Sequence, residues 1–163
     1  MWKVKSSKIH GTGVFATRDI KKNTNIIEYI GEKIKKSEGD RRSERRIKKY
    51  LNSETTGSVY IFELNKKYDI DGSPLYNKAR YINHSCDPNC EVDIINNQIW
   101  ISSIKKIKKG QELSYDYGYE FEKNDFKDHV CKCGSSKCIG YIICSDQWHK
   151  YLKHIKQLVK NKK

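Results

Sequence analysis

The sequence predicts a mostly β fold of the α+β class, in which several small sheets are joined by turns and accompanied by short helices. Three segments have the composition of short strands, namely residues 26–32, 58–64 and 98–104. Helices are expected at residues 35–56 and 145–163. A chain of 163 residues is long enough to bury a core as one domain.

Charge sets this chain apart from an average globular protein. It has 33 Lys and Arg residues against 20 Asp and Glu residues, a formal net charge of +13. This excess favours an anionic partner, with nucleic acid and an acidic membrane surface as candidates, although any single lysine is better explained as solvated surface. Two prolines and 36% hydrophobic residues fit an ordered protein.

The chain has no apolar run of about 18 residues and no apolar segment after Met1, so we expect neither a membrane span nor a secretory signal. The six cysteines are therefore interpreted as metal ligands or free thiols in preference to a disulfide framework. The bias toward Lys, Ile and Asn indicates AT-rich coding, as in a microbe, a parasite or a virus.

Residues 2–34 are β-rich, and the sequence H-G-T-G at residues 10–13 predicts a turn that enters a strand. A second turn at residues 19–24 precedes the strand at residues 26–32. Glycines at this spacing let a backbone approach a ligand closely. The alternative is an ordinary hairpin turn, which also uses glycines.

Residues 35–56 are strongly basic. From Lys35 to Tyr50, eight basic residues stand against three acidic ones, a net charge of +5. A narrow apolar edge formed by Ile47, Tyr50 and Leu51 predicts a short, mostly exposed helix.

The densest group of reactive side chains lies at residues 80–90, R-Y-I-N-H-S-C-D-P-N-C. A strand-like stretch at residues 79–82 precedes Asn83, His84 and Cys86, and the Asp-Pro-Asn sequence predicts a tight turn. We therefore expect these three side chains on an irregular loop, where functional groups are commonly presented.

On either side of this loop, strands are expected at residues 68–72 and 98–104. A turn at residues 108–110 then leads to the sequence E-L-S-Y-D-Y-G at residues 112–118. That segment begins an acidic strip, since residues 112–128 contain six acids against two lysines, a net charge of −4.

A second cysteine group has the pattern C-x-C-x₄-C at Cys131, Cys133 and Cys138. Three thiols on one short loop are one ligand short of the tetrahedral set that structural zinc requires. Disulfides are the alternative, and the missing secretory signal argues against them. Cys90 and Cys144 remain as core or surface thiols.

The C-terminal helix, expected over residues 145–163, could be capped by Asp146. Its apolar stripe predicts a face that docks on the domain, and its other face and tail carry lysines that either are solvated or contact phosphate. The stripe consists of Trp148, Tyr151, Leu152, Ile155, Leu158 and Val159, and the lysines are Lys150, Lys153, Lys156, Lys160, Lys162 and Lys163.

Several of these segments together resemble a known family. Residues 80–89 resemble the R-[FY]-I-N-H-S-C-x-P-N signature of SET-domain protein lysine methyltransferases. Residues 10–16 and 28–32 resemble the opening of that domain, and residues 112–117 resemble its E-L-x-[FY]-D-Y signature. The motifs occur in the family's order and cover about residues 8–142, so the chain is identified as a SET domain with a post-SET zinc-binding segment.

The resemblance implies a β-clip-like fold in which the N-H-S-C and E-L-x-Y-D-Y segments thread past each other as a pseudoknot. It places the SET domain at residues 2–122 and the post-SET zinc segment at 127–143, followed by the basic helix at 145–163. In this family the insert at residues 35–56 borders the substrate groove, and a merely solvated helix is the alternative. Tyr76 occupies a position where the family often has glycine.

The resemblance also implies S-adenosylmethionine as cofactor and one zinc ion. Cys86 would complete the zinc ligands Cys131, Cys133 and Cys138, so that zinc clamps the C-terminal segment onto the cofactor loop. A structural role is the alternative for His84, and the two roles are compatible. The expected cofactor-binding residues are His10, Gly11, Thr12, Gly13, Tyr60, Arg80, Tyr81, Asn83, His84 and Lys132.

By the same resemblance, Tyr117 is the catalytic tyrosine and Tyr60 faces the cofactor and the lysine channel. Tyr115 occupies the position that sets how many methyl groups the channel admits, and a tyrosine there predicts mainly monomethylation. A buried core role is the alternative for any single tyrosine, but the motif around Tyr117 favours catalysis.

The implied function is methyl transfer to a protein lysine, with a histone lysine in chromatin as the first candidate. Two alternatives stay open, a non-histone substrate and a catalytically silent SET module that binds chromatin or DNA. The acidic strip suits a basic histone tail, and the basic insert and C-terminal helix suit nucleosomal DNA. The expected location is the nucleus, a host nucleus for a microbe or virus, or otherwise the cytoplasm.

Overall fold

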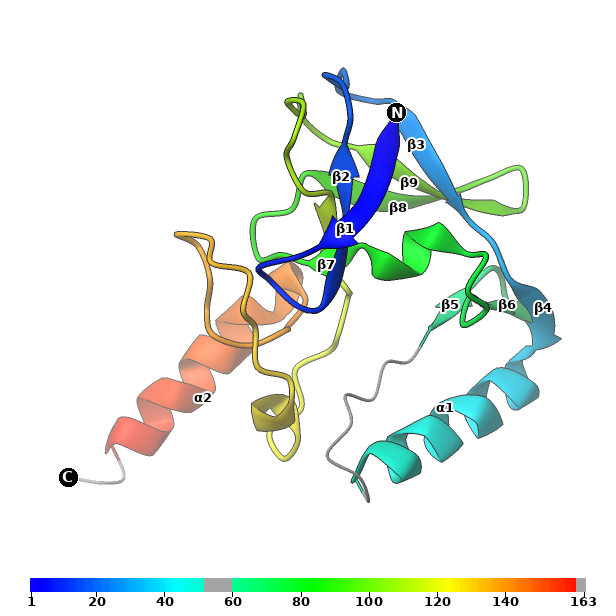
Figure 1. The fold of residues 1–163 in the computed structure, drawn as a ribbon. Helices are drawn as coiled ribbons and strands as arrows, with labels where there is room; N and C mark the ends of the chain where they lie inside the picture. The colour runs from blue at the N-terminus through cyan, green and yellow to red at the C-terminus, as the bar shows by residue number, and fades with distance from the viewer. Residues whose placement is uncertain (52–59, 161–163) are drawn as a thin grey trace.

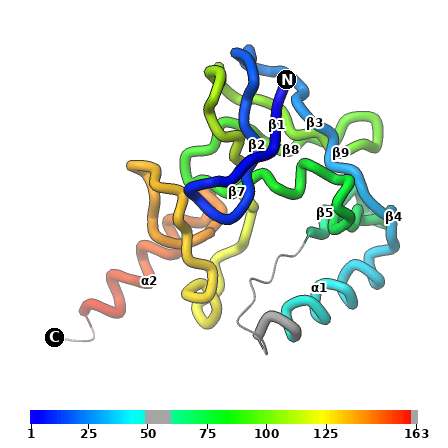
Figure 2. The backbone as a smooth tube through the Cα atoms, viewed as in Figure 1, coloured from blue at the N-terminus to red at the C-terminus, as the bar shows by residue number. Residues whose placement is uncertain are grey.

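The computed structural model describes residues 1–51 and 60–160, with only the backbone described for residues 49–51. In this part of the chain the strands form four small sheets, as expected of a mostly β fold (Figure 1). The sheets pack into one body, and the two α-helices project from the same end of it in this view (Figures 1 and 2). Residues 58 and 59 of the expected strand 58–64, and residues 161–163 of the expected helix, lie outside the described residues.

Three of the sheets are antiparallel. The first is a hairpin, and the other two have three strands in the orders β3-β9-β8 and β4-β6-β5. Their strands are β1 (Trp2–Ser6), β2 (Thr12–Ala16), β3 (Asn25–Tyr29), β4 (Glu32–Lys35), β5 (Ile61–Glu63), β6 (Tyr68–Asp71), β8 (Cys90–Ile95) and β9 (Gln98–Ser103).

The fourth sheet joins the two signature motifs. Its strands β7 (Asn83–His84) and β10 (Ser114–Tyr115) run parallel, with Asn83 opposite Ser114 and His84 opposite Tyr115. The two motifs expected to pass each other therefore lie side by side, and this pairing creates the site described below.

The stretch expected as a strand at residues 79–82 is instead part of a 3₁₀ helix, η1 (Lys78–Tyr81). Asn77 causes this difference because its buried side chain donates to the Gly72 carbonyl and its backbone N–H donates to the Pro74 carbonyl. These bonds close a turn that leads directly into η1. Tyr76, which replaces the family's common glycine, is accommodated because its ring is 61% exposed.

Strand β8 was not expected, since the turn signals of the Asp-Pro-Asn sequence obscured its start at Cys90. The segment predicted as one strand over residues 26–32 is divided into β3 and β4 near Gly31. A Cβ atom at Gly31 would lie 2.2 Å from the carbonyl oxygen of Asp71, so only glycine lets the two backbones approach this closely.

The two expected helices are present as α1 (Lys36–Leu51) and α2 (Trp148–Lys160). A short 3₁₀ turn, η3 (Ser145–Gln147), precedes α2. Asp146 lies inside this turn, so the expected cap at the start of a continuous helix is replaced by a tighter turn. Another 3₁₀ turn, η2 (Phe126–Asp128), lies between the SET motifs and the cysteine loop.

Two separate cores stabilise the fold. The main core lies between the sheets and contains fully buried side chains such as Ile99 and Ile101. The second core contains Phe126, Ile143 and Tyr151, and it holds α2 against the cysteine-rich segment. Each fully buried large apolar side chain stabilises the fold by roughly 1.5 to 3 kcal/mol. The orientation of α2 therefore depends on the C-terminal segment.

Candidate functional site: a tyrosine-lined centre beside a four-cysteine cluster

Asn83 connects the central loop to the glycine turn. Its side-chain nitrogen donates to the carbonyl oxygens of His10 at 3.3 Å and Thr12 at 3.1 Å. It also lies 2.8 Å from a carboxylate oxygen of Glu112. The structure thus brings the predicted cofactor turn and the predicted cofactor loop together, although they are far apart in sequence.

Glu112 links Asn83 to Ser7, a structural role that sequence reasoning missed. Its carboxylate accepts from the Ser7 hydroxyl at 2.7 and 2.9 Å in addition to Asn83. A Cβ atom at Gly13 would lie 2.3 Å from this carboxylate, so the glycine makes room for it. Gly11, with φ of +45°, supplies the turn that closes the hairpin.

His84 links the tyrosine motif to the cysteine cluster. Its Nδ1 accepts the backbone N–H of Tyr117 at 3.2 Å, which assigns the proton of the neutral ring to Nε2. Burial lowers the pKa of His84, an effect that outweighs the nearby Asp116 carboxylate, so the ring is neutral near pH 7. Nε2 lies 3.6 Å from the sulfur of Cys86 and can donate to it. The structural role considered for His84 is supported by these contacts.

The predicted catalytic tyrosines pack against each other. The ring centroids of Tyr115 and Tyr117 are 5.0 Å apart, and the Tyr117 hydroxyl donates to the Ile82 carbonyl at 3.0 Å. Burial raises the pKa of both phenols well above the ordinary value, so both are neutral at physiological pH. Phe62 and Tyr29 extend this aromatic wall, with Phe62 5.9 Å from Tyr115 and 4.4 Å from Tyr29.

Tyr60 and Arg80 form a stacked pair at another edge of this centre. The Arg80 guanidinium lies 4.1 Å from the Tyr60 ring centroid and 5.5 Å from that of Tyr81, and it donates to the Ser73 carbonyl. Its Nε is buried and has no partner among the described residues. A buried cationic donor of this kind suits an anionic ligand group such as a carboxylate.

One predicted cofactor-binding residue, Lys132, makes no polar contact with the others in the described part of the chain. Lys132 is exposed between two cysteines of the C-terminal loop. Among residues 1–51 and 60–160, no hydrogen bond or ion pair joins its side chain to the other predicted cofactor residues.

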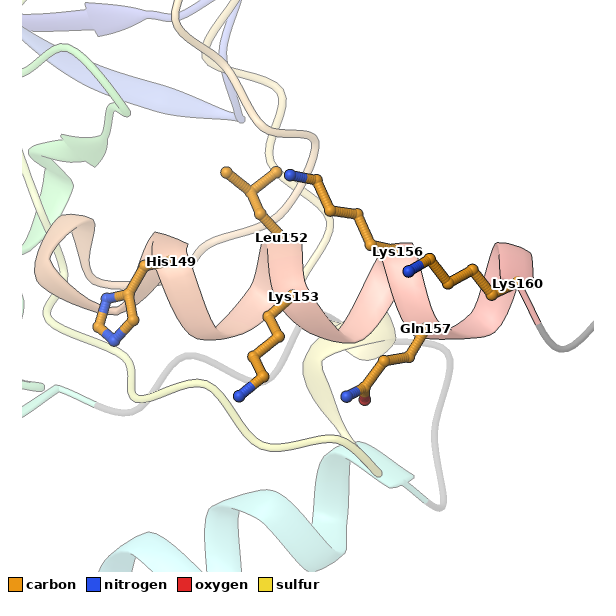
Figure 3. A pocket seen from close by; sticks show the side chains of 6 residues that line it. All are labelled: His149, Leu152, Lys153, Lys156, Gln157 and Lys160. Atoms are coloured by element: carbon orange, nitrogen blue, oxygen red, sulfur yellow. The ribbon is translucent and has the colours of Figure 1, made fainter.

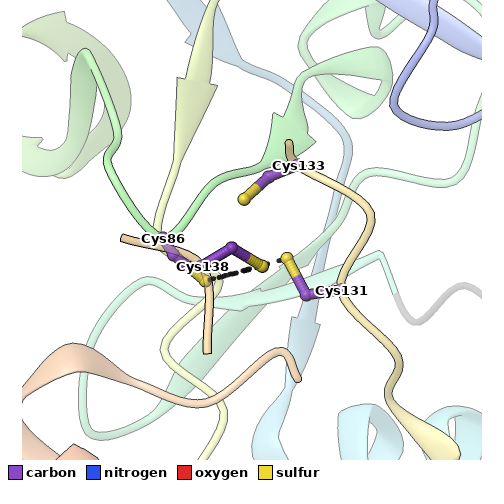
Figure 4. Close-up of side chains that lie close together, drawn as sticks. All are labelled: Cys86, Cys131, Cys133 and Cys138. Atoms are coloured by element: carbon purple, nitrogen blue, oxygen red, sulfur yellow. Dashed lines mark hydrogen bonds between the residues drawn. The ribbon is translucent and has the colours of Figure 1, made fainter. Parts of the chain in front are cut away.

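The four cysteines predicted as zinc ligands converge, although Cys86 is far in sequence from the other three (Figure 4). Their sulfur atoms all lie within 4.8 Å of one another. The Cys86 sulfur is 3.7 Å from that of Cys131 and 4.0 Å from that of Cys138. Zinc–thiolate bonds of about 2.3 Å in a tetrahedron require sulfur–sulfur distances of about 3.8 Å. This donor set therefore fits a structural zinc ion.

The thiols of this cluster differ in pKa when no cation is bound. Burial acts to raise the pKa of Cys133, but backbone hydrogen bonds outweigh it and lower that pKa to about 7. Burial raises the pKa of Cys86 to about 11 and that of Cys131 still higher. Without a cation both groups would stay protonated at neutral pH, whereas zinc deprotonates its thiol ligands outright. Cys90 and Cys144 lie outside the cluster, and burial raises the pKa of each thiol to about 12 and 11 respectively.

The acidic strip expected at residues 112–128 is divided by the fold. Glu112 is engaged as described, and Asp116 accepts backbone N–H groups of Gly118 and Ser145. These two acids are therefore structural, and only part of the predicted acidic strip is exposed. The four exposed acids are Glu120, Glu122, Asp125 and Asp128.

Comparison with known proteins agrees with this geometry. The SET domain family matches residues 11–118. The chain is 38% identical over 136 residues to "Histone-lysine N-methyltransferase 2D" of Homo sapiens and 43% identical over 136 residues to "Histone-lysine N-methyltransferase trr" of Drosophila melanogaster. It is 36% identical over 140 residues to "Histone-lysine N-methyltransferase, H3 lysine-4 specific" of Saccharomyces cerevisiae.

These matches cover 81%, 81% and 83% of this chain. The chain spans only 2%, 5% and 12% of the lengths of the three relatives. None of the helices in the described part of the chain has the length and apolar character needed to cross a membrane. The matched motifs, the paired strands that unite them and the four-cysteine cluster that follows them show that the chain belongs to the SET domain family.

Proposed function

We propose that this chain is an S-adenosylmethionine-dependent histone-lysine N-methyltransferase whose substrate is lysine 4 of histone H3. The observation that carries the proposal is the position of Tyr117, which packs on His84 and Tyr115 at the point where the two signature strands meet. The names of the relatives supply the substrate, since the yeast relative is specific for lysine 4 of H3.

The reaction needs a neutral lysine amine, because free lysine with a pKa of about 10.4 is almost entirely protonated at neutral pH. When bound, the cofactor would supply a methyl group activated on a sulfonium, and the lysine amine would bond to this methyl carbon as the sulfur leaves as a neutral thioether. The buried wall of Tyr115, Tyr117 and Phe62 disfavours the charged ammonium form by excluding water. The tyrosines are neutral, so they offer no counter-ion to retain the ammonium, while their hydroxyls can orient the amine.

The residues proposed to hold the cofactor surround Asn83. The backbone of the turn at residues 10–13, together with Asn83 and His84, would bind one part of it, and the unpartnered Nε of Arg80 would bind an anionic group. Tyr60, Tyr81 and the exposed Lys132 would complete the site.

The degree of methylation is proposed to be mainly monomethylation. Tyr115 is buried and packs against Phe62 and Tyr117, and its hydroxyl would occupy space that additional methyl groups need. A phenylalanine at this position would leave that space open.

Zinc is proposed to be held by the four-cysteine cluster, where it would tie the post-SET segment at residues 127–143 to the loop that carries Asn83 and His84. The SET domain is proposed to occupy residues 2–122 and the basic C-terminal helix residues 145–163. Histone tails fit the exposed acids of residues 119–128, and nucleosomal DNA would then lie near the basic surfaces. A nuclear location follows from a histone substrate.

The test is transfer of labelled methyl from S-adenosylmethionine to recombinant histone H3, free or in nucleosomes. We expect label on H3, lost when that lysine is replaced by arginine and lost again in a Tyr117→Phe variant. The matched control is Tyr76→Phe, which removes a hydroxyl from an exposed ring. Label on other proteins of a mixed lysate but none on H3 would favour a non-histone substrate. No label, despite measured cofactor binding, would favour a silent binding module.

A further inference from the structure

The two basic segments of the chain differ in how their charge is used. In α1, Arg42 is paired with Glu32, Glu38 and Asp71, at 2.6, 2.7 and 2.8 Å. Arg46 also donates to Asp71, a carboxylate that is only 1% exposed. These arginines therefore hold α1 on β4 and β6 and are poorly available to another anion.

Other cations of α1 are paired in the same way. Lys36 lies 2.8 Å from both Glu63 and Asp69, and Arg41 is bound by Glu38. Burial of Asp69 in one of these contacts shields that pair from solvent ions. Lys36, Arg42 and Arg46 thus attach this helix to the domain, and Arg41 is paired within the helix.

Helix α2 is different, because its cations point outward and only half of its predicted apolar stripe is docked: Trp148, Tyr151 and Ile155 pack into the second core, whereas Leu152, Leu158 and Val159 are exposed. The Trp148 indole N–H also donates to the Ile143 carbonyl. At 100° per residue, the opposite side places one histidine and three lysines within about 60° of each other on the helix surface. We call these four the basic stripe: His149, Lys153, Lys156 and Lys160.

The basic stripe lines an open hollow of about 510 Å³, together with Leu152 and Gln157 (Figure 3). The sequence of α2 contains no acidic residue. Among the described residues, no ion pair reaches Lys153, Lys156 or Lys160. These cations are therefore available to an external anion.

We propose that the basic stripe binds the phosphate backbone of duplex DNA without regard to sequence. The inference deepens the proposed function, on which it rests for the presence of nucleosomal DNA, by assigning the DNA contact to α2 and not to α1. From His149 to Lys160 the helix rises about 16 Å, a length that spans about five phosphates along one strand. Positive side chains in one row along a helix suit contact with the phosphate backbone.

A membrane surface is less suited to this helix. A helix that lies in a bilayer interface inserts a broad apolar face, whereas the second core uses Trp148, Tyr151 and Ile155 of α2. Leu152, Leu158 and Val159, 49%, 39% and 57% exposed, are the apolar side chains of α2 left outside that core. The observations therefore favour DNA.

The test is equilibrium binding of the whole chain to a fluorescent DNA duplex over a series of salt concentrations, with two unrelated sequences. Neutralising Lys153, Lys156 and Lys160 together to Gln should lower the slope of log K against log salt by about 2.7, since each phosphate contact contributes about 0.9. The control removes paired charges from α1 with Lys36→Gln and Arg41→Gln, which are held by Glu63, Asp69 and Glu38, and should leave the slope unchanged.

Equal loss in the α1 control, an unchanged slope in the α2 variant, or binding to phosphatidylserine vesicles without binding to DNA would each overturn the assignment. Methylation of a short H3 peptide, which lacks DNA, separates the two proposals. If the peptide is methylated but DNA is not bound by α2, only the present inference fails. If DNA is bound but no histone substrate is methylated, only the proposed function fails.

Discussion

Removing the Glu112 carboxylate should destabilise the protein and weaken cofactor binding at the same time. Glu112 makes charge-assisted hydrogen bonds with Ser7 and Asn83. Each bond of this kind contributes about 1.5 kcal/mol or more, so Glu112→Ala should cost about 3 kcal/mol in the free energy of unfolding. For a domain of this size that corresponds to a melting temperature lower by about 6 to 12 °C.

The conservative variant Glu112→Gln keeps one acceptor for Asn83 and gains a donor for the Ser7 hydroxyl, so its cost should be about 1 kcal/mol. Asn83 also retains its bonds to the glycine turn, so the fold persists in both variants. Because the turn is no longer fixed by the carboxylate, the dissociation constant of S-adenosylmethionine should rise more in the Ala variant than in the Gln variant.

The assay combines thermal unfolding by circular dichroism with calorimetric titration of the cofactor. The control is Glu120→Ala, which removes an exposed acid from the same segment and should change stability by less than about 0.5 kcal/mol. If Glu112→Ala melts at the same temperature as the control and binds the cofactor equally well, the carboxylate does not fix the turn and the reasoning is wrong.

Three further predictions concern zinc, product and acid stability. Purified protein should contain about one zinc ion per chain by elemental analysis, and Cys86→Ser should lose it while Cys90→Ser, another buried thiol, keeps it. Tyr115→Phe should raise the share of dimethylated and trimethylated product by mass spectrometry, and an unchanged product distribution would count against its role. Asp71 is buried, which raises its pKa, but the two arginines of α1 dominate and hold the pKa well below the ordinary value. Its contribution to stability is therefore present above the unfolded-state pKa of about 3.9 and is lost as the pH falls below it. Asp71→Asn should flatten the acid limb of a melting-temperature profile between pH 2 and 6, and a profile parallel to wild type would contradict this.

The local parts of the fold could be predicted from the sequence because local signals determine them. The glycine turn before β2 and the amphipathic pattern of α2 are examples, since neither depends on a distant partner. The stretch at residues 79–82 could not be predicted, because a strand-like sequence was overridden by the buried Asn77 and its bonds to the Gly72 and Pro74 carbonyls. Such bonds are invisible in a propensity pattern.

The candidate site, like the fold, could be predicted from the sequence only in part. The convergence of the four cysteines was expected from the family motif and is observed. The role of Glu112 was missed because its partner Ser7 lies 105 residues away, so the carboxylate was counted with the exposed acids. The sequence could have placed Phe62 in the aromatic wall, since it lies two residues from Tyr60 and strand residues two apart share a face.

The charge of α1 was also misjudged from sequence. Its arginines suggested an exposed basic surface, but Asp71, in a strand far along the chain, pairs with two of them. The net charge of this segment therefore counted its cations correctly, but it did not show which of them are already paired with acids of the same protein. The lysines of α2 were interpreted correctly as outward-facing because the apolar stripe that faces the core is periodic in the sequence itself.

The measurement that tests the central claim most directly is mass spectrometry of an N-terminal histone H3 peptide after incubation with the protein and S-adenosylmethionine. The account predicts the gain of one methyl group on lysine 4, absent with Tyr117→Phe and present with Tyr76→Phe. A peptide that stays unmodified although the protein is folded, contains zinc and binds the cofactor would contradict the account, as would equal methylation by the Tyr117→Phe variant.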